Sequence, residues 1–203
     1  MKVFAFKIES GICMAFLFFH QEENKMERLS IKNLVLSGFF IAFGLVLPFL
    51  TSQIPSLGSK FLPMHLPVLI AGFVCGWQYG LIVGFIVPVF RSMLFGMPPM
   101  FPTAVAMAAE LAVYGCMTGL MYKLLPKRDA YIYAALLISM ICGRIAWGLA
   151  GVLLYGLGGT SFTWEVFMAG AFINAVPGII IQLILIPIII IALKKAKVMQ
   201  NAG

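Results

Sequence analysis

The sequence predicts an all-α integral membrane protein, a bundle of six transmembrane helices with both termini on the cytoplasmic side. Of its 203 residues, 62% are apolar and only 10% are charged, and the mean hydropathy is +1.04. A soluble domain has roughly 45–50% apolar and about 25% charged residues, so this excess needs lipid as its solvent. Six helices of about 20 residues use nearly the whole chain, which leaves no room for a separate soluble catalytic domain.

The first 25 residues are predicted to be an extension upstream of the true start, ahead of a single membrane domain over residues 26–203. Their apolar run, residues 12–19, is too short to span a bilayer. It also lacks the small-residue cleavage site of a secretory signal. Met26 opens a stretch that is typical of entry into a first membrane helix.

Hydropathy and helix-breaking residues divide the rest of the chain into six predicted spans. These are residues 31–50, 63–76, 81–94, 103–125, 130–155 and 166–193. Residues 77–80 are predicted to be a tight turn, and the three prolines of residues 96–102 are expected to keep that loop non-helical. The last span is expected to bend at Pro177 or Pro187.

Basic residues predict the orientation. If the N-terminus is cytoplasmic, nine lysines and arginines lie on that side and one, Lys60, lies opposite. The nine are Lys25, Arg28, Lys32, Lys123, Lys127, Arg128, Lys194, Lys195 and Lys197. This asymmetry favours a multi-pass plasma membrane protein with both ends inside, and it explains the net charge of +7 without nucleic acid.

Polar groups within the spans are the candidate substrate-binding residues, since such groups are costly in hydrocarbon. Glu110, Arg91, Arg144 and Asn174 are expected roughly 8 to 18 Å below the outer surface. Helical spacing adds Tyr114 to the face of Glu110, and it adds Trp147 to the face of Arg144. His65 would close this chamber from the outer end of its helix. The interpretation left open is structural: a Glu110–Arg144 ion pair, an interhelical bond from Asn174, and a helix-capping or interfacial His65.

Signatures of enzymes are missing from the sequence. There is no phosphate-binding Walker loop, no zinc-protease motif and no nucleophile elbow. The four cysteines stand singly in apolar stretches, without metal-ligand spacing. The sequence therefore predicts a protein without catalytic residues, metal or cofactor, and any uptake driven by ATP needs a partner with an ATPase.

Small residues recur at helical spacing and favour close helix contacts. Gly72, Gly76, Gly80 and Gly84 follow one another at steps of four, and packing within the chain is the expected use of these glycines. Gly38 and Ala42 in the first span form a small-xxx-small pair that is a better candidate for docking a partner.

Several stretches resemble the substrate-binding S components of energy-coupling factor (ECF) transporters. They are residues 61–76 (FLPMHLPVLIAGFVCG), residues 79–84 (YGLIVG), residues 88–92 (PVFRS) and residues 96–102 (GMPPMFP). The resemblance in style covers about residues 30–195. It implies a six-helix bundle that captures a vitamin at the outer face, a transmembrane coupling subunit and two cytoplasmic ATPases. It also implies docking through Ala-x-x-x-Ala on the first helix, a pattern that Gly38 and Ala42 match with one glycine substitution.

The charged residues of the spans also bear on the identity of the vitamin. Two buried arginines against one glutamate favour an anionic ligand, and pantothenate suits Arg144, Asn174 and Glu110. Pyridoxine, riboflavin, a thiamine precursor and folate stay open as alternatives. A membrane scaffold of the rod-shape-determining kind, with a related bundle and no ligand, is the alternative from another class. An intramembrane glutamate protease is disfavoured, because Glu110 has no second acidic or histidine partner at helical spacing.

Overall fold

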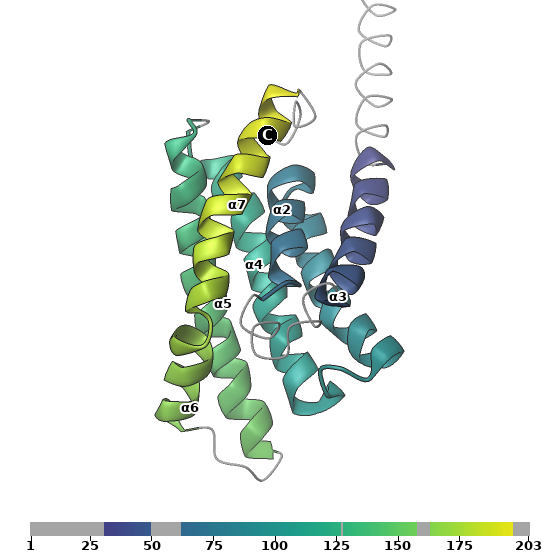
Figure 1. The fold of residues 1–203 in the computed structure, drawn as a ribbon, viewed down its shortest axis with the longest axis vertical. Coiled ribbons are helices and arrows are strands. Elements are labelled where there is room, and N and C mark those ends of the chain that lie inside the picture. Colours follow the sequence, from purple (N-terminus) through teal and green to yellow (C-terminus); the bar gives the residue numbers. More distant parts are fainter. Residues whose placement is uncertain (1–30, 50–61, 127, 158–162, 197–203) are drawn as a thin grey trace, which may run out of the picture.

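A computed structural model describes residues 31–49, 62–126, 128–157 and 163–196, and most of the described part is helical (Figure 1). The first helix is Ile31–Phe49. It is followed by α2 (His65–Cys75), α3 (Trp77–Phe95), the π-type turn η1 (Met100–Ala104), α4 (Val105–Leu124), α5 (Ala130–Leu157), α6 (Trp164–Met168), the π-type turn η2 (Ala169–Ile173) and α7 (Val176–Lys195). The extension predicted for residues 1–25 lies outside the described residues.

Five helical segments of the described chain are long and apolar enough to cross a membrane. They are Ile31–Phe49, Trp77–Phe95, Met100–Leu124, Ala130–Gly156 and Val176–Lys195. The remaining predicted span, residues 63–76, corresponds to α2, whose 11 residues reach about 16 Å, roughly half of the hydrocarbon thickness. The all-α membrane fold is therefore confirmed, whereas the count of six spans stays a prediction.

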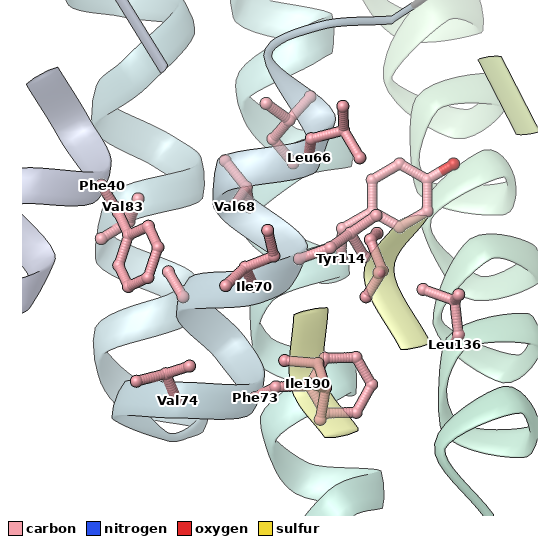
Figure 2. Packing of buried hydrophobic residues seen from close by; sticks show 14 of the residues in the cluster. Phe40, Leu66, Val68, Ile70, Phe73, Val74, Val83, Tyr114, Leu136 and Ile190 are labelled. Atoms are coloured by element: carbon pink, nitrogen blue, oxygen red, sulfur yellow. The ribbon is translucent and has the colours of Figure 1, made fainter. Parts of the chain in front are cut away.

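The short helix α2 lies at the centre of the bundle. Every one of its residues is buried, as expected for a helix that is apolar on all sides. It contacts α3, α4 and α7, while α4 also packs along α3 and α5. Figure 2 shows part of the resulting core, which includes Leu66 and Phe73 of α2, Tyr114 of α4, Leu136 of α5 and Ile190 of α7. The core therefore joins α2, α4, α5 and α7.

Glycines bring α2, α3 and α4 into backbone contact. A Cβ atom on Gly80 would meet the Gly115 carbonyl group, and one on Gly84 would meet the carbonyl group of Leu111. On α2, a Cβ atom on Gly72 would meet the Thr118 hydroxyl group and the Gly115 carbonyl oxygen. We call these contacts the glycine seam. They confirm that Gly72, Gly80 and Gly84 of the predicted stripe serve packing within the chain, whereas Gly76 has nothing within 4 Å of a Cβ position.

The turn between α2 and α3 is tighter than predicted. Residues 77–80 were expected to form it, but they are the first turn of α3. Gly76 alone reverses the chain, at φ +91°, a backbone conformation that side chains with a Cβ rarely adopt. The predicted position of the turn was wrong because a single glycine, Gly76, is sufficient for the reversal.

Two further boundaries differ from the sequence-based expectation. The proline-rich loop ends earlier than predicted, because the chain coils from Met100 onward even though Phe101 keeps extended dihedral angles (φ −120°, ψ 134°). The predicted last span is divided: α6 and η2 end at Ile173, and α7 begins at Val176. The interruption lies directly before Pro177, one of the two residues at which a bend was predicted.

The ends of the described chain lie at the same end of the bundle, with the start of the first helix and the end of α7 both at the top of Figure 1. A pair of exposed charged side chains joins α5 to α7 there, with Lys194 Nζ 2.7 Å from Asp129 Oδ1. The even number of spans and the cytoplasmic position of this end stay predictions.

Candidate functional site

The centre of the bundle contains an ion pair between α4 and α5. Arg144 Nη1 lies 2.8 Å from Glu110 Oε1, and the two side chains are only 8% and 3% exposed. This confirms that the two residues predicted from the sequence meet each other. The distance is that of an ion pair, but the Glu110 oxygen lacks the alignment of a hydrogen bond.

His65 extends this ion pair into a cluster. Its Nε2 lies 3.6 Å from Glu110 Oε1, and its side chain is 2% exposed. The imidazole contacts the Tyr114 ring edge-on, at 5.4 Å between ring centroids. Tyr114 follows Glu110 by one helical turn on α4, so both residues belong to the same face of that helix. We call Glu110, Arg144, His65 and Tyr114 the polar cluster. The interfacial position considered for His65 is therefore wrong, because α2 begins inside the bundle.

Several buried polar atoms of the described chain, most of them in the polar cluster, have no hydrogen-bond partner there. They are Oε1 of Glu110, both ring nitrogens of His65, Nε and Nη2 of Arg144, and Nε2 of Gln182 on α7. An unmet hydrogen bond on a buried group costs about 1–3 kcal/mol. Native proteins leave few such groups, so a concentration of them marks a site that an additional molecule can complete.

A glycine lets the two charged helices approach. A Cβ atom on Gly143 would lie 2.7 Å from Cε1 of Tyr114, so only glycine admits this ring against α5. The next residue along α5 is Arg144, which therefore faces Glu110 one turn below Tyr114 on α4. The sequence analysis missed Gly143. Its position directly before an intramembrane arginine is the signal that would have found it.

Arg91 does not belong to the polar cluster. Its Nη1 donates a hydrogen bond of 2.7 Å to the carbonyl oxygen of Leu45, at the C-terminal end of the first helix. Its guanidinium group lies 4.8 Å from the ring centroid of Phe49 and 5.6 Å from that of Phe95. The expectation that Arg91 lines the same chamber is thus corrected. A cation at a helix C-terminus completes an exposed carbonyl group there.

Asn174 is also separated from the cluster, because its side chain is exposed in the turn between η2 and α7. Helical spacing over an unbroken last span would place Asn174 and Gln182, eight residues apart, on one face. The π-type turn η2 adds a residue to the helical repeat, and the break before Pro177 shifts the phase again. Gln182 is consequently 1% exposed while Asn174 faces outward, so the structure brings Gln182 toward the core in place of Asn174.

Trp147 packs against α6 and η2, the first part of the predicted last span. Its ring stacks on Phe167 at 6.0 Å, and a Cβ atom on Gly170 would lie 2.6 Å from this indole. Phe167 in turn covers Gly148. Next to these contacts lies a hollow of about 420 Å³ between α5 and α6. Its walls are almost wholly apolar: Ile145, Gly148, Leu149, Val152, Thr163, Trp164 and Phe167.

The first helix attaches to the bundle by one side. Phe40 is buried, Asn33 reaches the Cys75 carbonyl oxygen at 3.4 Å, and Gly44 contacts Val87. The other side is exposed and includes both residues of the predicted docking pair, Gly38 and Ala42. Nothing within the described chain comes within 4 Å of a Cβ atom placed on Gly38. A smooth strip of this helix is therefore available to a neighbouring helix.

Comparison of the sequence with known protein families identifies the family of this chain. The family model described as "ECF transporter, substrate-specific component" matches residues 32–190, which is more than three quarters of the chain. The chain belongs to this family. No curated protein and no solved structure matches it. The match confirms the resemblance on which the sequence analysis depended.

Membership of this family tells what kind of protein the chain is. ECF S components are substrate-binding transport subunits, which implies a small-molecule substrate and association with ECF ATPase and coupling subunits. Together with the five long apolar helices, it makes the chain a multi-pass plasma membrane protein. The ligand-free scaffold of the rod-shape-determining kind loses its support, because the family is defined by substrate specificity.

Proposed function

We propose that this S component captures a vitamin-type micronutrient at the polar cluster, without catalysis of its own, and delivers it to an ATP-driven coupling complex. The observation that carries the proposal is the set of buried polar atoms without hydrogen-bond partners around the Glu110–Arg144 pair. A purely structural ion pair is expected to be hydrogen-bonded throughout, since an unsatisfied buried network is less stable than an apolar core. A bound molecule with several polar groups would complete this network.

The surroundings of the cluster support a ligand site as well. Small-molecule sites have largely apolar walls with a few converging polar groups. Here Tyr114, Leu66 and Leu136 supply apolar surface, and Glu110, Arg144 and His65 supply the polar groups. Pantothenate is the specific candidate that we retain from the sequence, because its carboxylate, hydroxyl and amide groups match an arginine, a glutamate and a histidine.

The exposed strip of the first helix supports docking to the coupling subunit. Gly38 and Ala42 leave it free of bulky side chains at its middle, and small-xxx-small surfaces allow two membrane helices to approach closely. We propose that this strip is the docking surface for the transmembrane coupling subunit.

Mass spectrometry of small molecules released by heat from the protein, purified in mild detergent, tests the capture step. The wild type is expected to release one vitamin, and a doubly neutral variant, Glu110→Gln with Arg144→Gln, is expected to release none. Lys123→Met, at an exposed position near the end of α4, is the matched control and should retain the ligand. Equal amounts from the wild type and the double variant would show that the ligand binds elsewhere.

A further inference from the structure

The net charge of the polar cluster limits which ligands it can bind. The sequence suggested an excess of positive charge from two arginines, but Arg91 is bound to Leu45 on the first helix. Around His65, the described elements contribute Glu110 and Tyr114 from α4 and Arg144 from α5. α7 has no ionisable side chain before Lys194, and the one charged residue of α3 is Arg91. With a neutral imidazole, the cluster therefore has no net charge.

Hydrogen-bond donors dominate the unpaired atoms. Nε and Nη2 of Arg144 can only donate, and so can Nε2 of Gln182. One of the two His65 nitrogens also donates in the neutral ring. A ligand that completes the cluster must therefore bring acceptor oxygens. A carboxylate fits best, because its two oxygens match the planar fork of an arginine.

A carboxylate alone would give the cluster a net charge of −1 inside the membrane domain. Such a charge is costly where neither water nor a counter-ion balances it. A proton on His65 would balance this negative charge, because imidazole is the side chain that changes charge nearest to neutral pH. It lies 3.6 Å from the Glu110 carboxylate, and both of its nitrogens are free of partners in the described chain.

From this geometry we infer that the S component takes up a carboxylate-bearing ligand together with one proton, which His65 holds. The proton comes from the solvent, and no covalent bond of the ligand changes. Protonation gives His65 a second N–H donor and restores the neutrality of the site. The inference rests on the proposed capture of a vitamin at the polar cluster, and it adds the charge class of that vitamin and the coupling of its binding to a proton.

Isothermal titration calorimetry in nanodiscs of zwitterionic lipid tests this inference. The probes with a carboxylate are pantothenate, biotin and folate, and the probes without one are pantothenol, pyridoxine and riboflavin. Each is titrated at pH 7 in phosphate and in Tris, whose protonation enthalpies differ widely. We expect a carboxylate to bind, with an enthalpy difference between the buffers that equals uptake of one proton. Above neutral pH, its Kd should rise by about tenfold per pH unit.

His65→Gln supplies the second arm, with Lys123→Met as the control. The glutamine variant is expected to lose the buffer dependence and to bind the carboxylate at least tenfold more weakly. If this variant does not fold, the pH profile of the wild type decides alone. A ligand without a carboxylate, or carboxylate binding with the same enthalpy in both buffers, overturns the inference and leaves the proposed function intact. Failure of every probe, with no co-purified vitamin, overturns both.

Discussion

Arg91 fixes the C-terminal end of the first helix by donating a hydrogen bond to the carbonyl oxygen of Leu45, 46 positions earlier in the chain. The guanidinium group also lies over the rings of Phe49 and Phe95. A second hydrogen bond between this helix and the bundle joins Asn33 to Cys75, at the opposite end. The helix that carries the proposed docking strip is therefore held at both of its ends by polar contacts and along its middle by Phe40.

Substitution of Arg91 is expected to loosen the first helix without changing the polar cluster. Arg91→Met removes a charged hydrogen bond worth about 1.5–3 kcal/mol, so the detergent melting temperature should fall by several degrees. Arg91→Lys should recover only part of the loss, because an ammonium group cannot stack on two rings as a guanidinium does. Lys123→Met should melt like the wild type. Unchanged melting of Arg91→Met would show that the contact contributes nothing.

The glycine seam should tolerate no side chain. A Cβ atom on Gly80 would collide with the Gly115 backbone, which cannot move aside as a flexible side chain can. Gly80→Ala is therefore expected to lower the folded yield and the melting temperature sharply, by more than about 2 kcal/mol in stability. Gly38→Ala is the matched control, since its Cβ atom would meet open space. Equal melting of the two variants would contradict the seam.

The ion pair should respond differently to single and double substitution. Arg144→Ala leaves the Glu110 carboxylate buried without a counter-ion, and breaking such a pair costs about 3–5 kcal/mol. The double variant Glu110→Gln with Arg144→Gln removes both charges, so it should melt closer to the wild type than Arg144→Ala does. Thermal melting of the three proteins in one detergent measures the difference. If Arg144→Ala is the more stable variant, the pair is not the buried contact seen here.

The exposed strip of the first helix should matter only in the assembled transporter. Gly38→Leu adds a bulky group to a lipid-facing position, so folding and ligand binding are expected to stay at wild-type levels. Co-purification with the coupling subunit should fall, because the partner helix can no longer approach closely. Val46→Ala, on the same exposed side and near the end of the helix, is the control. Full assembly of Gly38→Leu would exclude the strip as the docking surface.

Asn174 should be dispensable for binding. Its side chain is exposed in the turn before α7, away from the residues that surround Tyr114. Asn174→Ala is therefore expected to keep the ligand affinity within about twofold, whereas Gln182→Leu should weaken it because it removes a buried donor. Binding titrations of both variants with the co-purified vitamin decide between the two residues. Loss of binding in Asn174→Ala alone would restore the arrangement expected from the sequence.

Hydropathy predicted the membrane fold because each long helix is uniformly apolar, and that signal depends on composition rather than on packing. Charge scarcity likewise identified Glu110 and Arg144, since two isolated opposite charges in hydrocarbon are expected to meet. The position of Arg91 was not predictable in this way. Its partner is a backbone carbonyl group of Leu45, which has no signature in a sequence.

The other differences between expectation and structure arise from where residues lie around and along their helices. In a continuous helix, Asn174 and Gln182 would lie on the same face. The π-type turn η2 and the break before Pro177 change the direction of the Asn174 side chain relative to that of Gln182. A π-type turn depends on tertiary packing and leaves no clear pattern in the residues. Similarly, α2 was expected to start at the outer surface, and its position deep in the bundle follows from contacts with α3, α4 and α7 rather than from its own composition.

The glycine seam has a mechanical consequence for admission of a guest. Where backbone lies on backbone, no side chain can change rotamer, so α2, α3 and α4 can shift only as one rigid block. The α5–α6 side is softer, since aromatic rings resting on Gly148 and Gly170 beside a hollow can slide at low cost. When a ligand enters the polar cluster, α5 with Arg144 should therefore move, while α4 with Glu110 stays fixed.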